Sequence, residues 1–205
     1  MENCPHCDPS SFALERTLLA TSNFSIVCDA HPLVEGHILI IPKRHISCAG
    51  AFSQDLFEEF LSHFQPVSTF ISDTYGTVSS FEHGVIGQTV FHAHVHVLPY
   101  NGEPTDIVPE GMKYLRVFPV GQLRKAYKKE GKYLFLSIGN RSWIVNSGLG
   151  QPRFFRDRFA QVLGVRERGD WKSMHNNAAL MQKVTKENES VQVKWKKWSK
   201  TRLLP

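Results

Sequence analysis

The sequence contains no long apolar segment and little cysteine. No window approaches the roughly 18 to 20 uninterrupted apolar residues of a membrane-spanning helix, so we expect a protein that does not cross the bilayer. The first ten residues, MENCPHCDPS, have neither a basic start nor an apolar segment, which argues against a secretory signal. We therefore expect a cytoplasmic location, where the four cysteines would be reduced rather than paired in a disulfide framework.

Basic residues are scarce in the first half of the chain and abundant in the second. Residues 1–109 contain three Lys or Arg and twelve Asp or Glu, a net charge of −9. Residues 110–205 contain 21 basic and seven acidic residues, a net charge of +14. This contrast predicts two structural units, with residues 110–205 as a basic C-terminal extension. Its charge either attracts phosphate-rich partners or keeps its surface solvated.

Residue patterns in the N-terminal half predict an α+β domain. Alternating apolar residues over 23–46 predict two strands. Residues 53–64 carry apolar side chains at helical spacing, and Pro66 is expected to kink or interrupt this helix. Beyond Pro66 the helix either stays broken or resumes towards Tyr75 and Gly76. Two further strands are predicted over residues 76–84 and 87–99. The order strand, strand, helix, strand, strand favours a mainly antiparallel sheet.

The basic extension is expected to be a smaller α+β unit. Its patterns predict a short basic helix, a hairpin and an amphipathic helix, at residues 121–131, 132–146 and 151–165 respectively. The last stretch, residues 186–205, is polar and basic and contains Trp195 and Trp198. These two tryptophans would either stack on the bases of a nucleic acid or belong to a packed or flexible tail.

Three histidines alternate in an otherwise apolar run, QTVFHAHVHVLPY, at residues 88–100. Because alternate residues of a strand project to one face, His92, His94 and His96 are expected to share a face. A single such histidine is most often structural or solvated. Three in phase beside the Gly87-Gln88-Thr89 turn indicate a metal site or a catalytic site instead.

This run resembles the signature of the histidine-triad (HIT) family, in which histidine alternates with apolar residues. Residues 92–98, HAHVHVL, match the signature H-φ-H-φ-H-φ-φ, and GQTV before them is similar to the family as well. Upstream, DAHPLVEGHILIIPKRHI at residues 29–46 resembles the family's other hallmark stretch. The two motifs occur in the family's order and spacing. The resemblance covers roughly residues 3–102 and implies a HIT-like, mainly antiparallel sheet with helices.

The resemblance implies an enzyme that cleaves at the α-phosphate of a nucleotide, such as a dinucleoside polyphosphate or a nucleotide phosphoramidate. His94 would attack phosphorus to give a covalent nucleotidyl-histidine, which water or another acceptor then resolves. A neutral imidazole is a good nucleophile near pH 7. One ring nitrogen must be free for this, so the other is expected to donate its proton elsewhere, for example to a backbone carbonyl.

Other site residues follow from the same resemblance. His96 and His37 would donate hydrogen bonds to the phosphate oxygens, and a carboxylate at position 29 suits the two hydroxyl donors of a ribose. The implied catalytic set is His37, Gln88, Thr89, His94 and His96. The implied nucleotide-binding set is Asp29, Glu82, Gln88, Thr89, His94 and His96.

Glu82, in the sequence FEHG, departs from the family pattern, which commonly has Asn or Gln at this position. A carboxylate beside a phosphate is unfavourable unless it is protonated or paired. Glu82 would therefore either change the leaving group that the site accepts or act as an acid or base.

Cys4 and Cys7 form a C-x-x-C pair near the N-terminus. Two thiolates with two histidines elsewhere fit a structural zinc site. The resemblance to zinc-binding members of the family implies His45 and His92 as the other two ligands. The alternative is a disordered terminus with two reduced thiols. With zinc bound, His92 would hold metal while His94 carries out the chemistry.

Three functions remain open at this stage. The chain is expected to be a nucleotidyl hydrolase, a nucleotidyltransferase or phosphorylase, or a nucleotide- or RNA-binding module with little catalysis. The strand–strand–helix pattern of the extension resembles the appendage of the CwfJ-like branch of the family. The extension would form a homodimer, cover the nucleotide site as a lid, or bind RNA or another polyanion.

Overall fold

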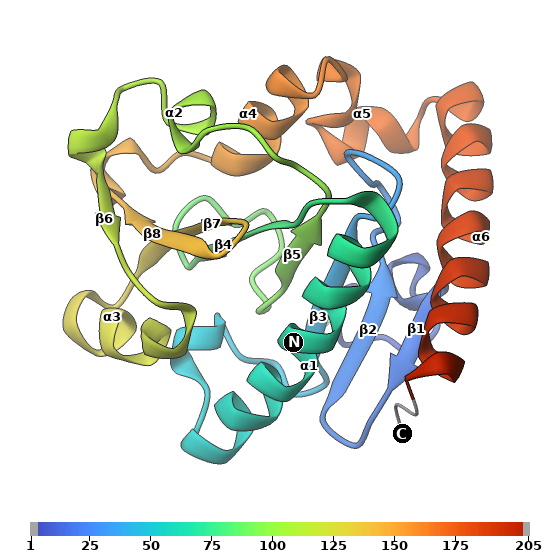
Figure 1. The fold of residues 1–205 in the computed structure, drawn as a ribbon, viewed down its shortest axis with the longest axis horizontal. Coiled ribbons are helices and arrows are strands. Elements are labelled where there is room, and N and C mark those ends of the chain that lie inside the picture. Colours follow the sequence, from blue (N-terminus) through green and yellow to red (C-terminus); the bar gives the residue numbers. More distant parts are fainter. Residues whose placement is uncertain (1–3, 203–205) are drawn as a thin grey trace.

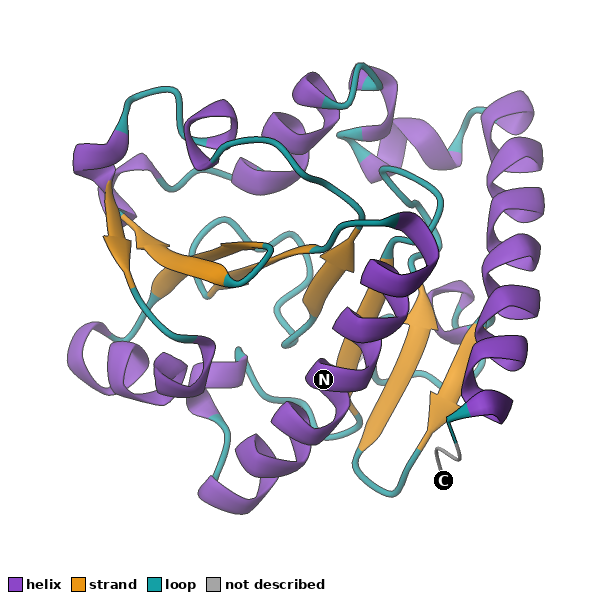
Figure 2. Ribbon diagram, viewed as in Figure 1, coloured by secondary structure: helices purple, strands orange, loops and turns teal. Residues whose placement is uncertain are grey.

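A single antiparallel sheet runs through the centre of the molecule, as Figure 1 and Figure 2 show. The computed structural model describes residues 4–202, and within them eight strands pair in the order β1-β2-β3-β5-β4-β7-β8-β6. The strands are β1 (Thr17–Ala20), β2 (Phe24–Cys28), β3 (Ile38–Pro42), β4 (Ser79–Gly84), β5 (Val95–Leu98), β6 (Leu115–Val117), β7 (Tyr133–Ile138) and β8 (Arg141–Val145). The predicted α+β class with a mainly antiparallel sheet is confirmed.

Helices cover both faces of this sheet. The α-helices of the described residues are α1 (Gln54–Tyr75), α2 (Pro104–Ile107), α3 (Leu123–Glu130), α4 (Phe154–Val162), α5 (Trp171–His175) and α6 (Ala178–Thr201). Apolar side chains of α1, α3 and α6 share one core with β2, β3 and β5, while those of α2 and α4 pack with β4, β7 and β8 in a second core. None of the helices among residues 4–202 combines the length and the apolar character needed to cross a membrane.

Helix α1 continues beyond Pro66 and ends at Tyr75, as the alternative of a resumed helix predicted. The Ser53 hydroxyl caps its N-terminus by accepting from the Leu56 amide at 3.3 Å, and Gly76 ends it in the left-handed region with φ of +84°. Pro66 lies inside the helix and does not interrupt it. Proline removes only one backbone donor, and the turn that follows is held to the core by buried Val67 and Phe70.

The sheet continues across the change in charge at residue 109. Strand β4 pairs with β7 over six residue pairs, from Ser79 opposite Ile138 to Gly84 opposite Tyr133. Strands β7 and β8 form the predicted hairpin, with Gly139 at φ of +58° in its turn. The basic extension therefore adds its strands to the sheet of the N-terminal half.

The histidine run is not a continuous strand, contrary to the prediction for residues 87–99. Strand β5 begins only at Val95, and the preceding residues form an irregular loop. Two backbone hydrogen bonds hold this loop, a local one from the His92 amide to the Val90 carbonyl at 2.9 Å and a long-range one from the Ala93 amide to the Ile46 carbonyl at 2.7 Å. His92 and His94 are thus released from strand geometry and point to different partners.

The polar C-terminal stretch forms most of α6, which packs along β1 and β2 (Figure 1). Trp195 is only 6% exposed and meets the Phe70 ring edge-on, with ring centroids 5.0 Å apart. Trp198 packs on the same ring at 5.5 Å. The two tryptophans therefore pack against α1, and buried Trp195 offers no free face for stacking on nucleic acid bases.

Candidate active site and metal cluster

The candidate site is the pocket beside His94 and His96. It lies on the face of the sheet opposite α1, where the N-terminal segment and helices α4 and α5 converge. It brings together residues from both halves of the chain. Its walls are formed by Pro5, His6, Phe12, Ala13, Asp29, Ala30, His31, Leu39, Thr89, Val90, His94, His96, Arg156 and Trp171. The extension thus supplies part of the site.

One ring nitrogen of His94 is hydrogen-bonded to the backbone, and the other is available to a ligand. Its Nδ1 lies 2.6 Å from the backbone carbonyl of His92, and because a carbonyl can only accept, Nδ1 must carry the proton. The lone pair is then on Nε2, the nitrogen left for a ligand in the pocket. Burial lowers the pKa of His94 below the ordinary histidine value, which favours this neutral form.

His96 and His37 form a directional chain of hydrogen bonds behind the pocket. The Leu33 amide donates to Nδ1 of His37 at 3.1 Å, so the proton of His37 must be on Nε2. That Nε2 donates to Nδ1 of His96 at 2.9 Å, which leaves the His96 proton on its own Nε2. This last nitrogen is buried and has no partner among the described residues. His96 can therefore donate into the pocket, whereas His37 acts only through His96.

Asp29 is bound by the extension. Its carboxylate accepts from Nη1 of Arg156 at 2.9 Å and from the His31 amide at 2.8 Å. Burial opposes ionisation of Asp29, but His37 and the Arg156 guanidinium together hold its pKa below the usual value. Arg156 is itself buried, and its charge in the pocket is expected to attract an anionic ligand.

Thr89 and Gln88 lie on the loop before β5, but only Thr89 lines the pocket. The Thr89 hydroxyl accepts from the indole N–H of Trp171 at 3.2 Å. The Gln88 amide turns away and donates to the Ser47 carbonyl at 2.7 Å. Gly87 allows this loop to touch the extension, because a Cβ there would lie 2.3 Å from the Gln151 carbonyl oxygen.

Glu82, which the resemblance placed in the nucleotide-binding set, does not line this pocket. Alternate residues of β4 face opposite sides of the sheet, and Phe81 stacks on His96 at 4.2 Å between ring centroids. The carboxylate of Glu82 points to the other side, where it accepts from the Ala49 amide at 2.8 Å and from the Tyr133 hydroxyl. Burial raises the pKa of Glu82 to about 7.

Two further buried histidines, His6 and His83, lie beside the site. His83 follows Glu82 and accepts at Nε2 from the amide of Phe155 at 3.1 Å, in the first turn of α4. His6 lies in the pocket wall, with its ring centroid 5.0 Å from that of His94. Its position between two candidate metal ligands, Cys4 and Cys7, is the one sequence signal that pointed to it.

The four residues named as metal ligands come together beyond the loop that carries His94. Potential ligand atoms of Cys4, Cys7, His45 and His92 all lie within 4.8 Å of one another. Nδ1 of His92 is 3.5 Å from the Cys4 sulfur and 3.3 Å from the Cys7 sulfur, and Nδ1 of His45 is 3.3 Å from the Cys7 sulfur. Tetrahedral zinc bonds of about 2.0 to 2.3 Å place neighbouring ligand atoms about 3.3 to 3.8 Å apart, so the cluster fits a zinc ion.

The tautomer of His92 agrees with metal binding. Its Nε2 is 2.7 Å from the Pro42 carbonyl, so the proton is on Nε2 and the lone pair of Nδ1 faces the two sulfurs.

A second group, Asp29, His37 and His96, also brings ligand atoms within 4.8 Å. Its facing nitrogens are already hydrogen-bonded to each other and its carboxylate is paired with Arg156, so it is less suited to a metal.

Comparison with known proteins agrees with the histidine motifs. Residues 14–103 match the family model described as the HIT domain. These residues are therefore similar to a HIT domain, and the match does not extend into residues 110–205.

Among curated relatives, the chain is 33% identical over 97 residues to the adenosine 5'-monophosphoramidase HNT1 of Saccharomyces cerevisiae, covering 44% of this chain and 58% of that protein. It spans between 54% and 64% of the length of the first three curated relatives. A solved HIT family protein from Bacillus anthracis is 24% identical, with a TM-score of 0.44 over 50% of this chain and 76% of its own. A Zn-bound histidine triad family protein from Mycobacterium smegmatis is 24% identical, with a TM-score of 0.34 over 43% of this chain and 68% of its own.

Proposed function

We propose that this chain is a nucleotidyl hydrolase that cleaves its substrate at the α-phosphate through a covalent intermediate on His94. The match of residues 14–103 to the HIT domain and the similarity to a phosphoramidase support this class of activity. The observation that carries the proposal is the 2.6 Å hydrogen bond from Nδ1 of His94 to the His92 carbonyl, because it leaves Nε2 unprotonated beside the pocket.

The first step forms a bond from Nε2 of His94 to the α-phosphorus and breaks the bond from that phosphorus to the leaving group. The leaving group departs with the bonding electron pair. The ring then carries a positive charge, which the His92 carbonyl stabilises through the Nδ1 proton. His96 donates its Nε2 proton as a hydrogen bond to a phosphoryl oxygen, where negative charge accumulates.

In the second step water attacks the same phosphorus and the bond to His94 breaks. The water oxygen is retained in the nucleoside monophosphate, its proton passes to solvent, and the imidazole returns to its neutral form. A phosphate ion in place of water would give a nucleoside diphosphate, so the two reactions share the first step. Product analysis with and without inorganic phosphate distinguishes hydrolysis from phosphorolysis.

Turnover of substrate by matched variants tests the proposal. Wild type and His94→Ala are compared on a fluorogenic adenosine phosphoramidate and on a diadenosine polyphosphate. We expect turnover by wild type and a loss of at least about 10³-fold in His94→Ala. Equal turnover in both proteins would refute a role for His94 as nucleophile. Nucleotide binding by both proteins without turnover would favour the binding-module alternative.

We further propose that zinc binds the cluster of Cys4, Cys7, His45 and His92 and has a structural role. Three features support this proposal: the types of ligand, the spacing of their atoms, and the proton of His92 on Nε2, which leaves Nδ1 to bind the metal. Bound zinc would neutralise the two thiolates and fix the N-terminal segment against the loop that carries His94. That segment includes His6 in the pocket wall, so zinc would also help to shape the pocket.

A further inference from the structure

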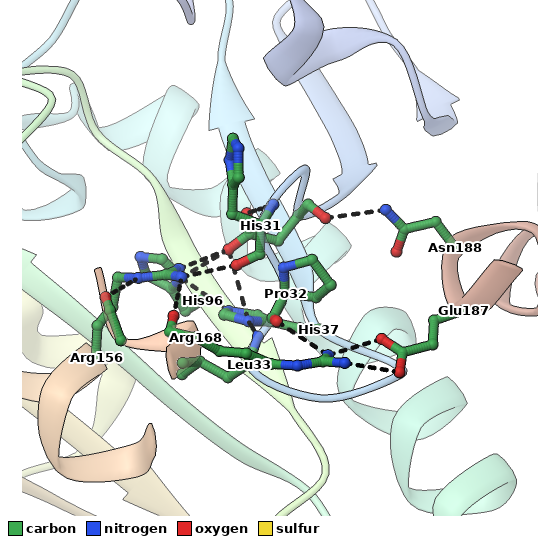
Figure 3. Close-up of polar contacts among 11 residues, drawn as sticks. His31, Pro32, Leu33, His37, His96, Arg156, Arg168, Glu187 and Asn188 are labelled. Carbon is green, nitrogen blue, oxygen red and sulfur yellow. Dashed lines mark hydrogen bonds and ion pairs between the residues drawn. The ribbon is translucent and has the colours of Figure 1, made fainter. Parts of the chain in front are cut away.

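The loop between β2 and β3 is held by the basic extension. Three backbone carbonyls of this loop accept hydrogen bonds from buried side chains beyond residue 150 (Figure 3). The pairs are the Asn188 amide to the Asp29 carbonyl at 3.1 Å, Nη2 of Arg156 to the His31 carbonyl at 2.7 Å, and Nη1 of Arg168 to the Pro32 carbonyl at 3.3 Å.

The Arg168 contact falls on the peptide group that orients His37. One peptide unit joins Pro32 to Leu33, and its carbonyl accepts from Arg168 while its N–H donates to Nδ1 of His37 at 3.1 Å. A cationic donor at the carbonyl polarises the peptide and strengthens its N–H as a donor. Figure 3 shows these contacts, which lead from Arg168 through Pro32 and Leu33 to His37.

Arg168 is itself held in place. It makes two parallel hydrogen bonds to the carboxylate of Glu187, at 2.7 and 2.9 Å, and its side chain is only 3% exposed. A bidentate pair of this kind fixes the guanidinium in position as well as in charge. The chain of contacts therefore runs from α6 through Arg168 and the Pro32–Leu33 peptide to the two histidines.

We propose that Arg168, held by Glu187, is a positioning residue that fixes the proton arrangement of His37 and His96 through the Pro32–Leu33 peptide. With the Leu33 N–H locked towards His37, the proton of His96 stays on Nε2, where it can reach a phosphoryl oxygen. If this peptide rotates, His37 can take its proton on Nδ1, beside the Asp29 carboxylate oxygen 3.5 Å away, and the donor in the pocket is lost. The catalytic consequence rests on the proposed nucleotidyl hydrolase activity, whereas the tautomer itself does not.

Arg158 provides a closely matched control in the same extension. It also makes a bidentate pair, with Glu110 at 2.8 and 2.6 Å, and donates to a backbone carbonyl, that of Ile107 at 2.9 Å. Its contacts lie outside the pocket and the β2–β3 loop. Arg158→Gln thus removes a paired arginine, as Arg168→Gln does, but leaves the contacts of His37 and His96 unchanged.

The experiment compares wild type, Arg168→Gln, Arg168→Lys and Arg158→Gln in the full chain. Nitrogen-15 NMR of the histidine rings, assigned with His37→Gln and His96→Gln variants, gives the tautomer of each ring. Steady-state kinetics on the adenosine phosphoramidate give kcat and KM. Should Arg168→Gln fail to fold, Arg168→Met/Glu187→Met replaces it, because the double variant leaves no buried charge unpaired.

We expect wild type and Arg158→Gln to hold both rings as the Nε2–H tautomer, and Arg168→Gln to show a mixture at His37. We also expect a fall in kcat of about tenfold or more with little change in KM in Arg168→Gln, and partial recovery in Arg168→Lys. Identical tautomers and kcat in the Arg168 and Arg158 variants would overturn the proposal, as would an Nδ1–H tautomer of His37 in wild type. If wild type turns over neither test substrate, the proposed function fails, and the NMR result alone decides the positioning role.

Discussion

The carboxylate of Asp29 and the guanidinium of Arg156 lie 2.9 Å apart, and each side chain exposes only 8% of its surface. Asp29 belongs to the HIT domain, and Arg156 belongs to the basic extension. The two halves of the chain, so different in charge, thus meet in a buried ion pair inside the candidate active site. Any ribose that binds Asp29 must share its carboxylate with this arginine.

Removing Arg156 is expected to destabilise the fold strongly. Arg156→Met leaves a buried carboxylate without its partner, which costs about 3 to 5 kcal/mol of unfolding free energy. Arg156→Met combined with Asp29→Asn should recover a large part of this loss. Urea denaturation measures all three proteins, with Arg153→Met as control, because Arg153 pairs only with half-exposed carboxylates. A loss below about 1 kcal/mol in Arg156→Met would contradict the account.

Glu82 is expected to make stability depend on pH. Its pKa is about 7 in the folded protein and near the ordinary 4.5 in the unfolded chain, so its favourable contribution is complete below pH 4.5 and is lost as the pH rises through 7. The full change is on the order of 3 kcal/mol. Glu82→Gln should therefore gain stability relative to wild type between pH 5 and pH 8, as measured by urea denaturation. A difference between the two proteins that stays constant over this range would show that Glu82 titrates normally.

Metal content and thermal stability together test the zinc site. Purified wild type should contain about one zinc ion per chain, and Cys4→Ser or Cys7→Ser should lose it and lower Tm by roughly 5 °C or more. Cys48→Ala is the control, since Cys48 is buried in the core and lies outside the cluster. It should lower Tm while keeping the metal. Unchanged zinc content in both Cys4→Ser and Cys7→Ser would exclude the cluster as the binding site.

The rate of substrate turnover should not fall at mildly acidic pH. A nucleophilic imidazole must be neutral, and burial lowers the pKa of His94 below the ordinary 6.5. The value of kcat/KM, which reports on the free enzyme, should therefore stay level from pH 8 to 6.5 and fall only at lower pH. An acid limb centred at pH 7 or above would mean that the group controlling the reaction is not a buried histidine of this kind.

Much of the HIT domain could be predicted from the sequence because its signals are local. Alternating apolar residues indicated β2 and β3, and helical spacing indicated the start of α1. The grouping of Cys4, Cys7, His45 and His92 was also predicted, because the C-x-x-C pair and the two histidines belong to recognisable motifs. In these cases the residue pattern and the structure depend on the same short-range geometry.

Features that depend on contacts between distant segments could not be predicted. Helix α6 is polar along most of its length, and its few buried residues, such as Val191 and Trp195, become meaningful only once α1 and β2 lie beneath them. Arg156 and Arg168 are ordinary basic residues in the sequence. Their roles arise because the fold places them against residues 29–33, more than a hundred positions earlier.

The orientation of Glu82 could not be predicted for a different reason. The resemblance of FEHG to the family pattern could not show which face of β4 each side chain takes in this chain. Here Phe81 and His83 face the histidine side, and Glu82 faces Ala49 and Tyr133. A family motif alone is weak evidence for a contact where the residue type departs from it.

The most direct test of the central claim is to trap the intermediate. Wild-type protein is mixed with the adenosine phosphoramidate, quenched within one turnover, and analysed by intact-mass and peptide-mass spectrometry. We predict a mass increase of one adenylyl group, which is adenosine monophosphate less one water, located on His94 and absent from His94→Ala. Turnover by wild type without any adduct on His94, or an adduct on another residue that persists in His94→Ala, would contradict the assignment of His94 as the nucleophile.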